Sequence, residues 1–273
     1  GEYVLKVSKA GFGDSYIPVS LTSTSNVTIN SQLIENTGFG NLSGYVKLPG
    51  GFQFSGTYSL ELVHPVSGAR PTNGIQPSSL SVGSTTFSNA PKYDVFQVNA
   101  GQWKLRFVAA GYTTVEGLVN IQKDSTTNFD IITMVPGSHN PAAVSGRALN
   151  ALNNQGIAGL TIRLRPGVNV LAGPYATDIN NVTISAITTG ADGSFAIAGV
   201  PPGNYTLEVT GANYATAYRT VISAGTDTPA NQNILVSPIL VNNEVRVVLS
   251  WNATPIDFDS HLEFVNSICS SGG

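Results

Sequence analysis

Two aspartates near the end of the chain, Asp257 and Asp259, are the residues best placed to do chemistry. They are two positions apart, so in an extended strand both carboxylates project from the same face. Together with Ser260 or a backbone carbonyl they could supply the hard oxygen ligands that Ca²⁺ prefers. Two carboxylates are few for a metal, and they could equally accept hydrogen bonds from nearby backbone amides. We therefore expect either a Ca²⁺ site or a structural role here, and no other cofactor.

The other reactive side chains are scattered. His64, His139 and His261 have no H-x-x-x-H spacing and no cysteine-rich neighbourhood, which argues against a histidine metal site and against a nucleophile triad. The only cysteine, Cys269, is either a buried free thiol or half of a disulfide whose partner lies beyond this sequence or in another chain. The sequence predicts a protein that is not an enzyme.

Five Asn-x-Ser/Thr sequons are candidate glycosylation sites. They are Asn26, Asn41, Asn181, Asn204 and Asn252. A chain so rich in Asn, Ser and Thr would contain a similar number by chance. The first three lie near predicted turns, whereas Asn204 and Asn252 flank predicted strands. Glycosylation is therefore an expectation that depends on the host.

One pattern, G-x-[YW]-x-L-x-[VF]-x-x-x-[GN]-[FY], occurs three times in the chain. Its copies occupy residues 1–12, 101–112 and 203–214. The second and third copies lie 102 residues apart, and the same offset carries Ser43-Gly44 onto Ser145-Gly146. Such an offset predicts tandem domains, which usually provide length, spacing or adhesion.

Each copy of the pattern predicts a strand. In the third copy Tyr205, Leu207 and Val209 alternate with polar residues, and this two-residue period is typical of a strand with one buried face. The glycine at the start of each copy, and the Gly or Asn before its closing aromatic, suit turns with positive φ. The repeated element is therefore a strand that ends in a tight turn.

Composition indicates a folded protein rather than a disordered chain. Charged residues make up 11% and hydrophobic residues 41%, and the net charge of −3 provides no basic patch for nucleic acid or anionic membranes. No apolar run approaches the roughly 20 residues that span a bilayer. The first residues do not resemble a signal peptide, so we expect any such segment to lie upstream or to have been removed.

The secondary structure is expected to be almost entirely β. No helical stripe is sustained, and the segment 142–153 is better explained by a strand followed by a turn. Strands are predicted at 17–21, 27–34, 58–63, 93–98, 103–108, 160–164, 182–187, 195–200, 205–209 and 245–251. Turn-rich stretches separate them. The predicted fold class is all-β, with tandem Ig-like sandwiches.

The repeat predicts four segments. Residues 1–39 would be the late strands of an incomplete sandwich, 40–137 and 138–240 two whole sandwiches, and 241–273 the first strands of a further β-domain. The connection at residues 136–141 contains two prolines, which restrict hinge motion. Incomplete sandwiches expose strand edges, so we expect either a longer chain or completion by another copy.

The second whole unit resembles the carboxypeptidase regulatory-like domain. The resemblance rests on TGADGSFAIAGVPPGNYTLEV at residues 189–209, preceded by VSGRA at 144–148 and GLTI at 159–162. It implies a transthyretin-like sandwich, used as an accessory or tandem module in secreted and cell-surface proteins. It covers 142–238 well and 41–135 less well, because the Asp-Gly turn is replaced there near Asn89. Residues 1–39 match only the late strands.

The C-terminal segment is similar to a second motif. Trp251, Asp257, Asp259 and His261 fit W-x(5)-D-[LF]-D-[SLA]-H, which occurs in bacterial and eukaryotic surface proteins. This similarity implies the start of a further β-sandwich domain.

These observations predict a secreted or cell-surface, non-catalytic structural protein, such as a stalk, adhesin or filament subunit. Its expected partners are other copies of itself or the flanking domains of a longer chain. The alternative is a carbohydrate-binding or spacer region of a secreted hydrolase, in which aromatic side chains would stack on surface glycans. The candidates for stacking are Tyr93, Trp103, Tyr112, Tyr205, Tyr214 and Tyr218, most of which recur at repeat-equivalent core positions.

Overall fold

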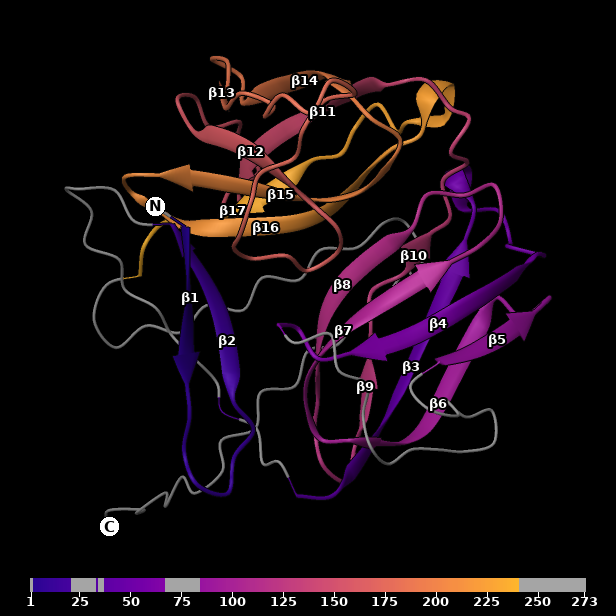
Figure 1. Ribbon diagram of the computed structural model, residues 1–273. Helices are drawn as coiled ribbons and strands as arrows, with labels where there is room; N and C mark the ends of the chain where they lie inside the picture. Colours follow the sequence, from indigo (N-terminus) through magenta and orange to yellow (C-terminus); the bar gives the residue numbers. More distant parts are fainter. Residues whose placement is uncertain (1, 21–32, 34–36, 67–83, 241–273) are drawn as a thin grey trace, which may run out of the picture. The chain divides into compact units, whose positions relative to one another are not determined.

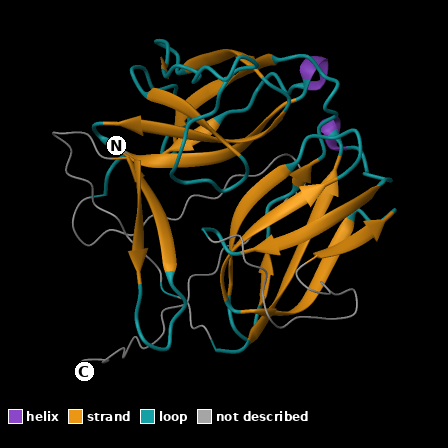
Figure 2. Cartoon of the chain, viewed as in Figure 1, coloured by secondary structure: helices purple, strands orange, loops and turns teal. Residues whose placement is uncertain are grey.

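The computed structural model describes residues 2–20, 33, 37–66 and 84–240 (Figure 1). Regular structure in these ranges is almost all β, as Figure 2 shows, and the described helices are two short 3-10 turns at Pro49–Gly51 and Gly225–Asp227. The all-β fold class is confirmed. The strand predicted at 245–251 lies outside the described residues, and so does the strand predicted at 27–34 except for Leu33, which belongs to no strand.

The first sandwich joins two sheets around one core. One sheet has the order β10 (Ile132–Thr133), β3 (Phe39–Lys47) and β6 (Lys92–Asn99), and β9 (Thr126–Asn128) also pairs with β3. The other has the order β5 (Ser84–Ser88), β4 (Thr57–Val63), β7 (Gly101–Val108) and β8 (Val115–Ile121). Alternate residues of both sheets meet in the core, including Leu42, Leu60 and Leu105.

The second sandwich repeats this arrangement 102 residues later. Its sheets have the orders β14 (Ser194–Val200), β11 (Ala142–Asn150), β17 (Ile234–Val236), and β13 (Ile187–Thr188), β12 (Thr161–Pro166), β15 (Gly203–Gly211), β16 (Tyr214–Ser223). Strand register is also repeated, because Leu62 lies opposite Leu105 as Leu164 lies opposite Leu207. The sequence offset is therefore a structural repeat.

The Asp-Gly turn of the second sandwich forms as its sequence predicts. Gly193 has a φ of 81°, and the Asp192 carboxylate accepts a hydrogen bond from the Ser194 N–H at 3.1 Å. Glycine adopts this left-handed conformation without the steric cost that a Cβ brings. The turn leads into β14, whose Phe195 and Ile197 point into the core.

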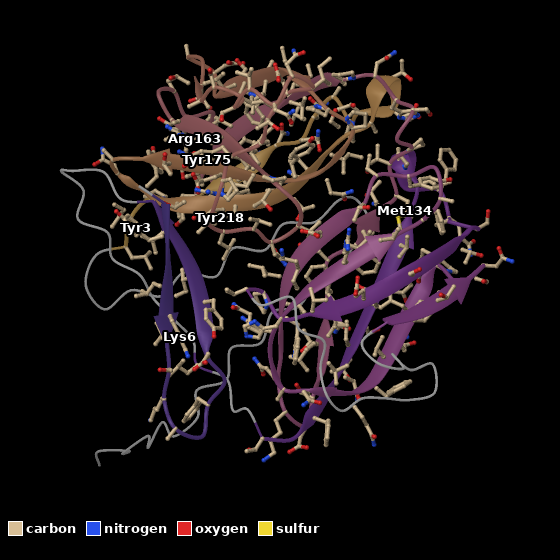
Figure 3. All side chains as sticks on the ribbon, viewed as in Figure 1. Tyr3, Lys6, Met134, Arg163, Tyr175 and Tyr218 are labelled. Atoms are coloured by element: carbon tan, nitrogen blue, oxygen red, sulfur yellow. The ribbon has the colours of Figure 1, made fainter. Side chains whose placement is uncertain are left out.

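The N-terminal hairpin, β1 (Glu2–Val7) and β2 (Ser15–Ser20), has the register of the β7–β8 pair. Leu5 lies opposite Ile17, as Leu105 lies opposite Gly117. The Tyr3 and Leu5 side chains are 58% and 42% exposed, whereas Leu105 is buried. Figure 3 labels Tyr3 and Lys6 on this hairpin. Its core-type face is therefore exposed in the described structure.

The strand predicted at 182–187 is wrong except at its last residue. The Asp178 carboxylate accepts hydrogen bonds from the Asn180 and Val182 N–H groups at 2.8 and 2.9 Å, and Asn181 has a φ of 60°. This side-chain-capped turn replaces the strand, and Val182 is exposed. The β-branched residues of this segment therefore do not mark a core-facing strand.

Candidate functional site

The outer face of the second sandwich's larger sheet is polar but buried. Arg165 of β12 and Asn204, Thr206 and Glu208 of β15 alternate with core residues, yet all four are less than a tenth exposed. Polar residues at such positions normally face water. Residues 167–176, which follow β12 and which we call the clasp loop, make hydrogen bonds to Arg165 and Thr206 on this face.

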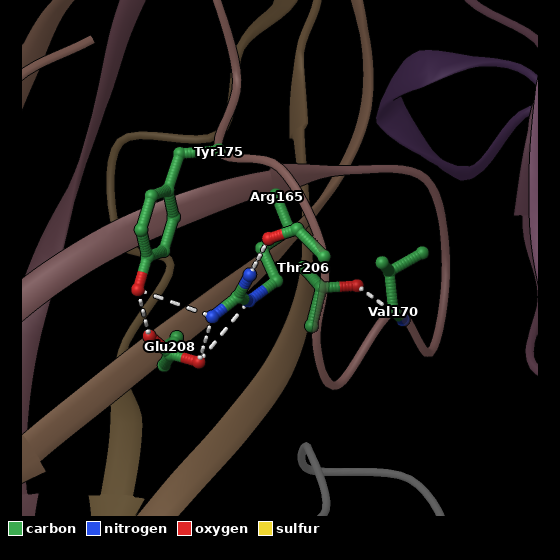
Figure 4. Close-up of polar contacts among 6 residues, drawn as sticks. Arg165, Val170, Tyr175, Thr206 and Glu208 are labelled. Atoms are coloured by element: carbon green, nitrogen blue, oxygen red, sulfur yellow. Dashed lines mark hydrogen bonds and ion pairs between the residues drawn. The ribbon is translucent and has the colours of Figure 1, made fainter. Parts of the chain in front are cut away.

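Arg165 and Glu208 form a buried ion pair beneath the clasp loop (Figure 4). The Arg165 Nε and Nη2 groups lie 3.1 and 2.8 Å from Glu208 Oε2. Arg165 also donates to the backbone carbonyl of Gly173. The Tyr175 hydroxyl accepts from Arg165 Nη2 at 3.1 Å and donates to Glu208 Oε1 at 3.2 Å. Both buried charges are thus hydrogen-bonded as well as paired, which offsets their desolvation.

Two guanidinium groups also hold Tyr175 through its ring. The central carbons of Arg163 and Arg165 lie 4.5 and 4.2 Å from the ring centroid, within the range of a cation–π contact. Figure 3 labels Arg163, Tyr175 and Tyr218 in this region. Burial and the nearby Glu208 carboxylate raise the pKa of Tyr218 above its usual value.

The beginning of the clasp loop is fixed by Thr206. Its hydroxyl accepts from the Val170 N–H at 3.0 Å, as Figure 4 shows, and donates to the Gly167 carbonyl at 2.8 Å. The two residues between these contacts, Val168 and Asn169, are therefore held in position relative to β15.

Val168 completes the core of the first sandwich. Its side chain is 0% exposed and packs in that core. Its N–H donates to the Glu116 carbonyl at 2.8 Å, and its carbonyl accepts from the Leu118 N–H at 3.3 Å. Gly117 lies opposite, where a Cβ would stand 2.8 Å from the Val168 carbonyl oxygen and 2.7 Å from the Phe129 ring. A glycine is required for this close approach.

Asn204 makes a second contact between the two repeats. Its Nδ2 donates to the Thr133 carbonyl at 2.6 Å, and its Oδ1 accepts from the Thr133 N–H at 3.3 Å. The side-chain amide thus pairs with a peptide unit as a neighbouring strand would. With Val168, this contact joins the repeats through buried hydrogen bonds at β8 and β10.

The described residues hold no candidate metal or membrane-spanning element. No group of three or more His, Cys, Asp or Glu in these ranges is arranged to hold a metal ion. Within the same ranges, no helix has the length and apolar character needed to cross a membrane.

The predicted glycosylation sites differ in position. Asn181 is exposed in its turn, and Asn41 is half-buried with its Oδ1 accepting from the Gln97 N–H at 3.2 Å. Asn204 is 6% exposed, and its amide both donates to and accepts from the peptide unit at Thr133. The remaining candidate site residues lie outside the described residues: Asn26, Asn252, Asp257, Asp259 and Cys269.

The aromatic residues considered for sugar stacking lie mostly in the cores. Tyr93 and Tyr205 are buried, and Trp103, Tyr112 and Tyr214 pack against the cores while partly buried. Sequence reasoning missed the clasp altogether. The available signal was the spacing of charged residues in a chain with only 11% of them: Arg163 and Arg165 lie two positions apart at the end of the strand predicted at 160–164, and Glu208 lies in the strand predicted at 205–209.

Fold and site define a protein of interlocked β-sandwich repeats. Residues 143–237 match the model of the carboxypeptidase regulatory-like domain family, which confirms the resemblance for that part of the chain. No curated protein matches the sequence.

Three solved pilin structures are similar over much of the chain. A streptococcal ancillary pilin is 16% identical, with 88% of this chain and 75% of that chain covered and a TM-score of 0.29. The shaft pilin SpaA from Lactobacillus rhamnosus GG is 13% identical, with coverages of 75% and 98% and a TM-score of 0.26. The group B streptococcus pilus 2b backbone protein is 12% identical, with coverages of 72% and 91% and a TM-score of 0.29. At these TM-scores the molecules do not share one arrangement of the whole chain.

Proposed function

We propose that this chain is a non-catalytic structural protein of the cell surface or extracellular space, in which each β-sandwich is locked to the next. The observation that carries the proposal is Val168, a residue of the second repeat that lies in the core of the first. The match of residues 143–237 to a module family of secreted and surface proteins supports the same class.

The lock gives the chain a fixed spacing between repeats. Neighbouring domains usually move relative to each other unless the contact between them is extensive or buried. Here the clasp loop is anchored by the buried Arg165–Glu208 pair on one side and enters the first core on the other. A stalk or filament subunit needs this property, because flexible joints would not keep the distance between its domains constant.

A distance measurement across the joint tests the proposal. Spin labels on cysteines at Phe52 and Leu152, two exposed positions in different repeats, would report the distance in the full chain with Cys269→Ser. We expect a narrow distribution, which Val168→Gly broadens and the exposed-site control Val182→Gly leaves narrow. A broad distribution in the parent protein would contradict a locked joint.

We further propose that the exposed face of the β1–β2 hairpin is completed in the assembled protein, by another copy or by a flanking domain. The support is the exposure of Tyr3 and Leu5 at positions that are core positions in both sandwiches. Deleting residues 1–12 should abolish filaments of the full chain and leave residues 138–240 folded. Filaments that form equally well without the hairpin would count against completion at this face.

Location and metal binding are tested separately. We propose a secreted or cell-surface location, which antibodies against residues 40–239 should show by labelling intact source cells; labelling only after lysis would contradict it. We also propose that Asp257 and Asp259 bind at most Ca²⁺. Calorimetric titration of the full chain with CaCl₂ should give heat that Asp257→Asn removes, if the carboxylates are ligands rather than structural groups.

A further inference from the structure

The outer edge of β16 contains an open segment between two capped ends. At one end the Gln232 side-chain amide bonds to both the N–H and the C=O of Ile222, at 2.8 Å each. At the other end the Ala215 N–H donates to the Ser237 carbonyl at 2.9 Å. Backbone groups of an antiparallel strand alternate in direction, so those of Thr220 and Tyr218 turn away from β15, as Ile222 does.

We call the backbone of Tyr218 and Thr220 the edge window. No hydrogen bond joins its outward groups to another residue in the described ranges. An unpaired strand edge is a template for an incoming strand. The caps on either side leave room for a short segment only.

The same window in the first repeat is filled. Glu116 and Leu118 lie 102 residues before Tyr218 and Thr220. The outward carbonyl of Glu116 accepts from the Val168 N–H, and the outward N–H of Leu118 donates to the Val168 carbonyl. The filling residue comes from the loop after β12 of the following repeat. The edge window of β16 is therefore equivalent to the edge of β8 that Val168 occupies with its backbone N–H and carbonyl.

Val66 is the residue of this chain that matches Val168 in the repeat. It lies 102 residues earlier, in the loop after β4, and its side chain is 56% exposed. Tyr16 of the N-terminal hairpin is the equivalent of Glu116, because Tyr16 pairs with Lys6 as Glu116 pairs with Arg106. The repeat therefore predicts that Val66 bonds to the backbone at Tyr16, as Val168 does at Glu116. The Tyr16 N–H instead donates to the Gln102 side chain at 3.3 Å, so the cap there is a different group.

We propose that Val66 of a second copy of this chain enters the edge window of β16. Its N–H would donate to the Tyr218 carbonyl and its carbonyl would accept from the Thr220 N–H. This is the hydrogen-bond pattern of Val168, made between molecules and at a longer distance because Arg219 stands where Gly117 stands. This contact specifies how copies of the chain would assemble, and it depends on the proposed function only because it requires that copies associate. Donor loop and receiving edge differ, so the contact is head-to-tail and can be repeated along a fibre.

Arg219 sets the strength of this contact. It stands where Gly117 stands in the first repeat, and at Gly117 a Cβ would lie 2.8 Å from the carbonyl oxygen of Val168. The incoming Val66 backbone must therefore stay further from β16 than Val168 stays from β8. The Val66 N–H must also give up its present hydrogen bond to His64 Nδ1, which is 3.3 Å long. Contact between copies is weaker than contact within the chain, and Arg219→Gly should tighten it.

Disulfide trapping tests the geometry in full-length chains carrying Cys269→Ser. Gly117 and Val168 are directly opposite in their bridge, so Val66→Cys of one copy should meet Arg219→Cys of another. Mixing the two variants under mild oxidation should give a mixed dimer. The matched control replaces Val66→Cys with Leu152→Cys, which is similarly exposed. Equal dimer yields in both mixtures would overturn the proposal.

Sedimentation velocity provides the second arm. Arg219→Gly should lower the dissociation constant of self-association about tenfold or more, and Val66→Asp should abolish association without changing the thermal unfolding of the chain. Chains that remain monomeric in every variant would overturn the docking of Val66. That result would leave the narrow spin-label distribution unaffected, so failure of this inference is distinguishable from failure of the locked joint.

Discussion

Trp103 and Tyr205 make the same hydrogen bond at equivalent positions of the two repeats. Trp103 Nε1 donates to the Asn99 carbonyl at 2.8 Å, and the Tyr205 hydroxyl donates to the Pro201 carbonyl at 2.9 Å. In each case the acceptor lies four residues earlier, just before β7 or β15 begins: Asn99 is the last residue of β6, and Pro201 directly follows β14. Two different rings thus fix the same turn, although Trp103 is half-buried and Tyr205 is buried.

The core role of the repeated strand predicts the effect of Leu207→Ala. Leu207 is fully buried, and its loss should lower the free energy of unfolding of the second sandwich by roughly 2 to 5 kcal/mol. Urea titration would measure this. Leu105→Ala should have a similar effect on the first sandwich, and exposed Leu152→Ala should have little. A small effect of Leu207→Ala would contradict a core strand.

Because Tyr205 is buried, we expect the free energy of unfolding to fall at alkaline pH. Burial raises the pKa of Tyr205 to about 12 from its usual 10.0. A raised folded-state pKa means that the contribution to stability is complete below pH 10 and is lost between about pH 10 and 12. Urea titrations at several pH values should show a shallower decline for Tyr205→Phe than for the exposed-site control Tyr45→Phe. Parallel declines would show that ionisation of Tyr205 is not linked to folding.

The buried ion pair predicts strong coupling between Arg165 and Glu208. Either Arg165→Met or Glu208→Leu alone leaves one buried charge unpaired and should cost about 3 to 5 kcal/mol of stability. The double variant should be much closer to the parent, because no uncompensated charge remains. Removal of the exposed Lys92–Asp94 pair is the control and should change stability little. Additive single effects would contradict this account.

Because Val168 belongs to the second repeat but packs in the first core, we expect its substitution to destabilise the first sandwich. Val168→Ala removes buried methyl groups from the first core and should cost that sandwich roughly 1 to 3 kcal/mol. Trp103 fluorescence would follow the first sandwich in a chain carrying Trp251→Phe. The control Val182→Ala alters an exposed valine of the second repeat and should leave the Trp103 transition unchanged. A Trp103 transition insensitive to Val168→Ala would exclude the contact.

Alternation of residue types predicted most strands because it reports which side chains share a face. It identified the core residues of β7 and β15, whereas the turn at Gly193 was predicted from the Asp-Gly dipeptide. It failed at residues 182–187, where the Asp178 carboxylate stabilises a turn that competes with a strand. Local hydrogen bonding of this kind is not visible in the period of a sequence.

The clasp could not be predicted for a different reason. Alternation placed Glu208 on the polar face of its predicted strand, and the strand predicted at 160–164 ended before Arg165. Alternation does not show whether another segment covers such a face. The covering segment is close in sequence to Arg165, yet its destination, the Gly117 region, is about half a repeat away. Only the three-dimensional path of the clasp loop brings Val168 and Gly117 together.

The parallel pairing of the first and last strands of each repeat determines how a repeat responds to pulling. β3 pairs in parallel with β10, and β11 with β17, where Ala148 lies opposite Ile234. Tension on the chain draws the start of the first strand and the end of the last strand in opposite directions along the strand axis. The hydrogen bonds between them are then loaded together in shear, rather than broken one after another as in a zipper. Each repeat therefore has a mechanical clamp between its two points of attachment, where load enters and leaves.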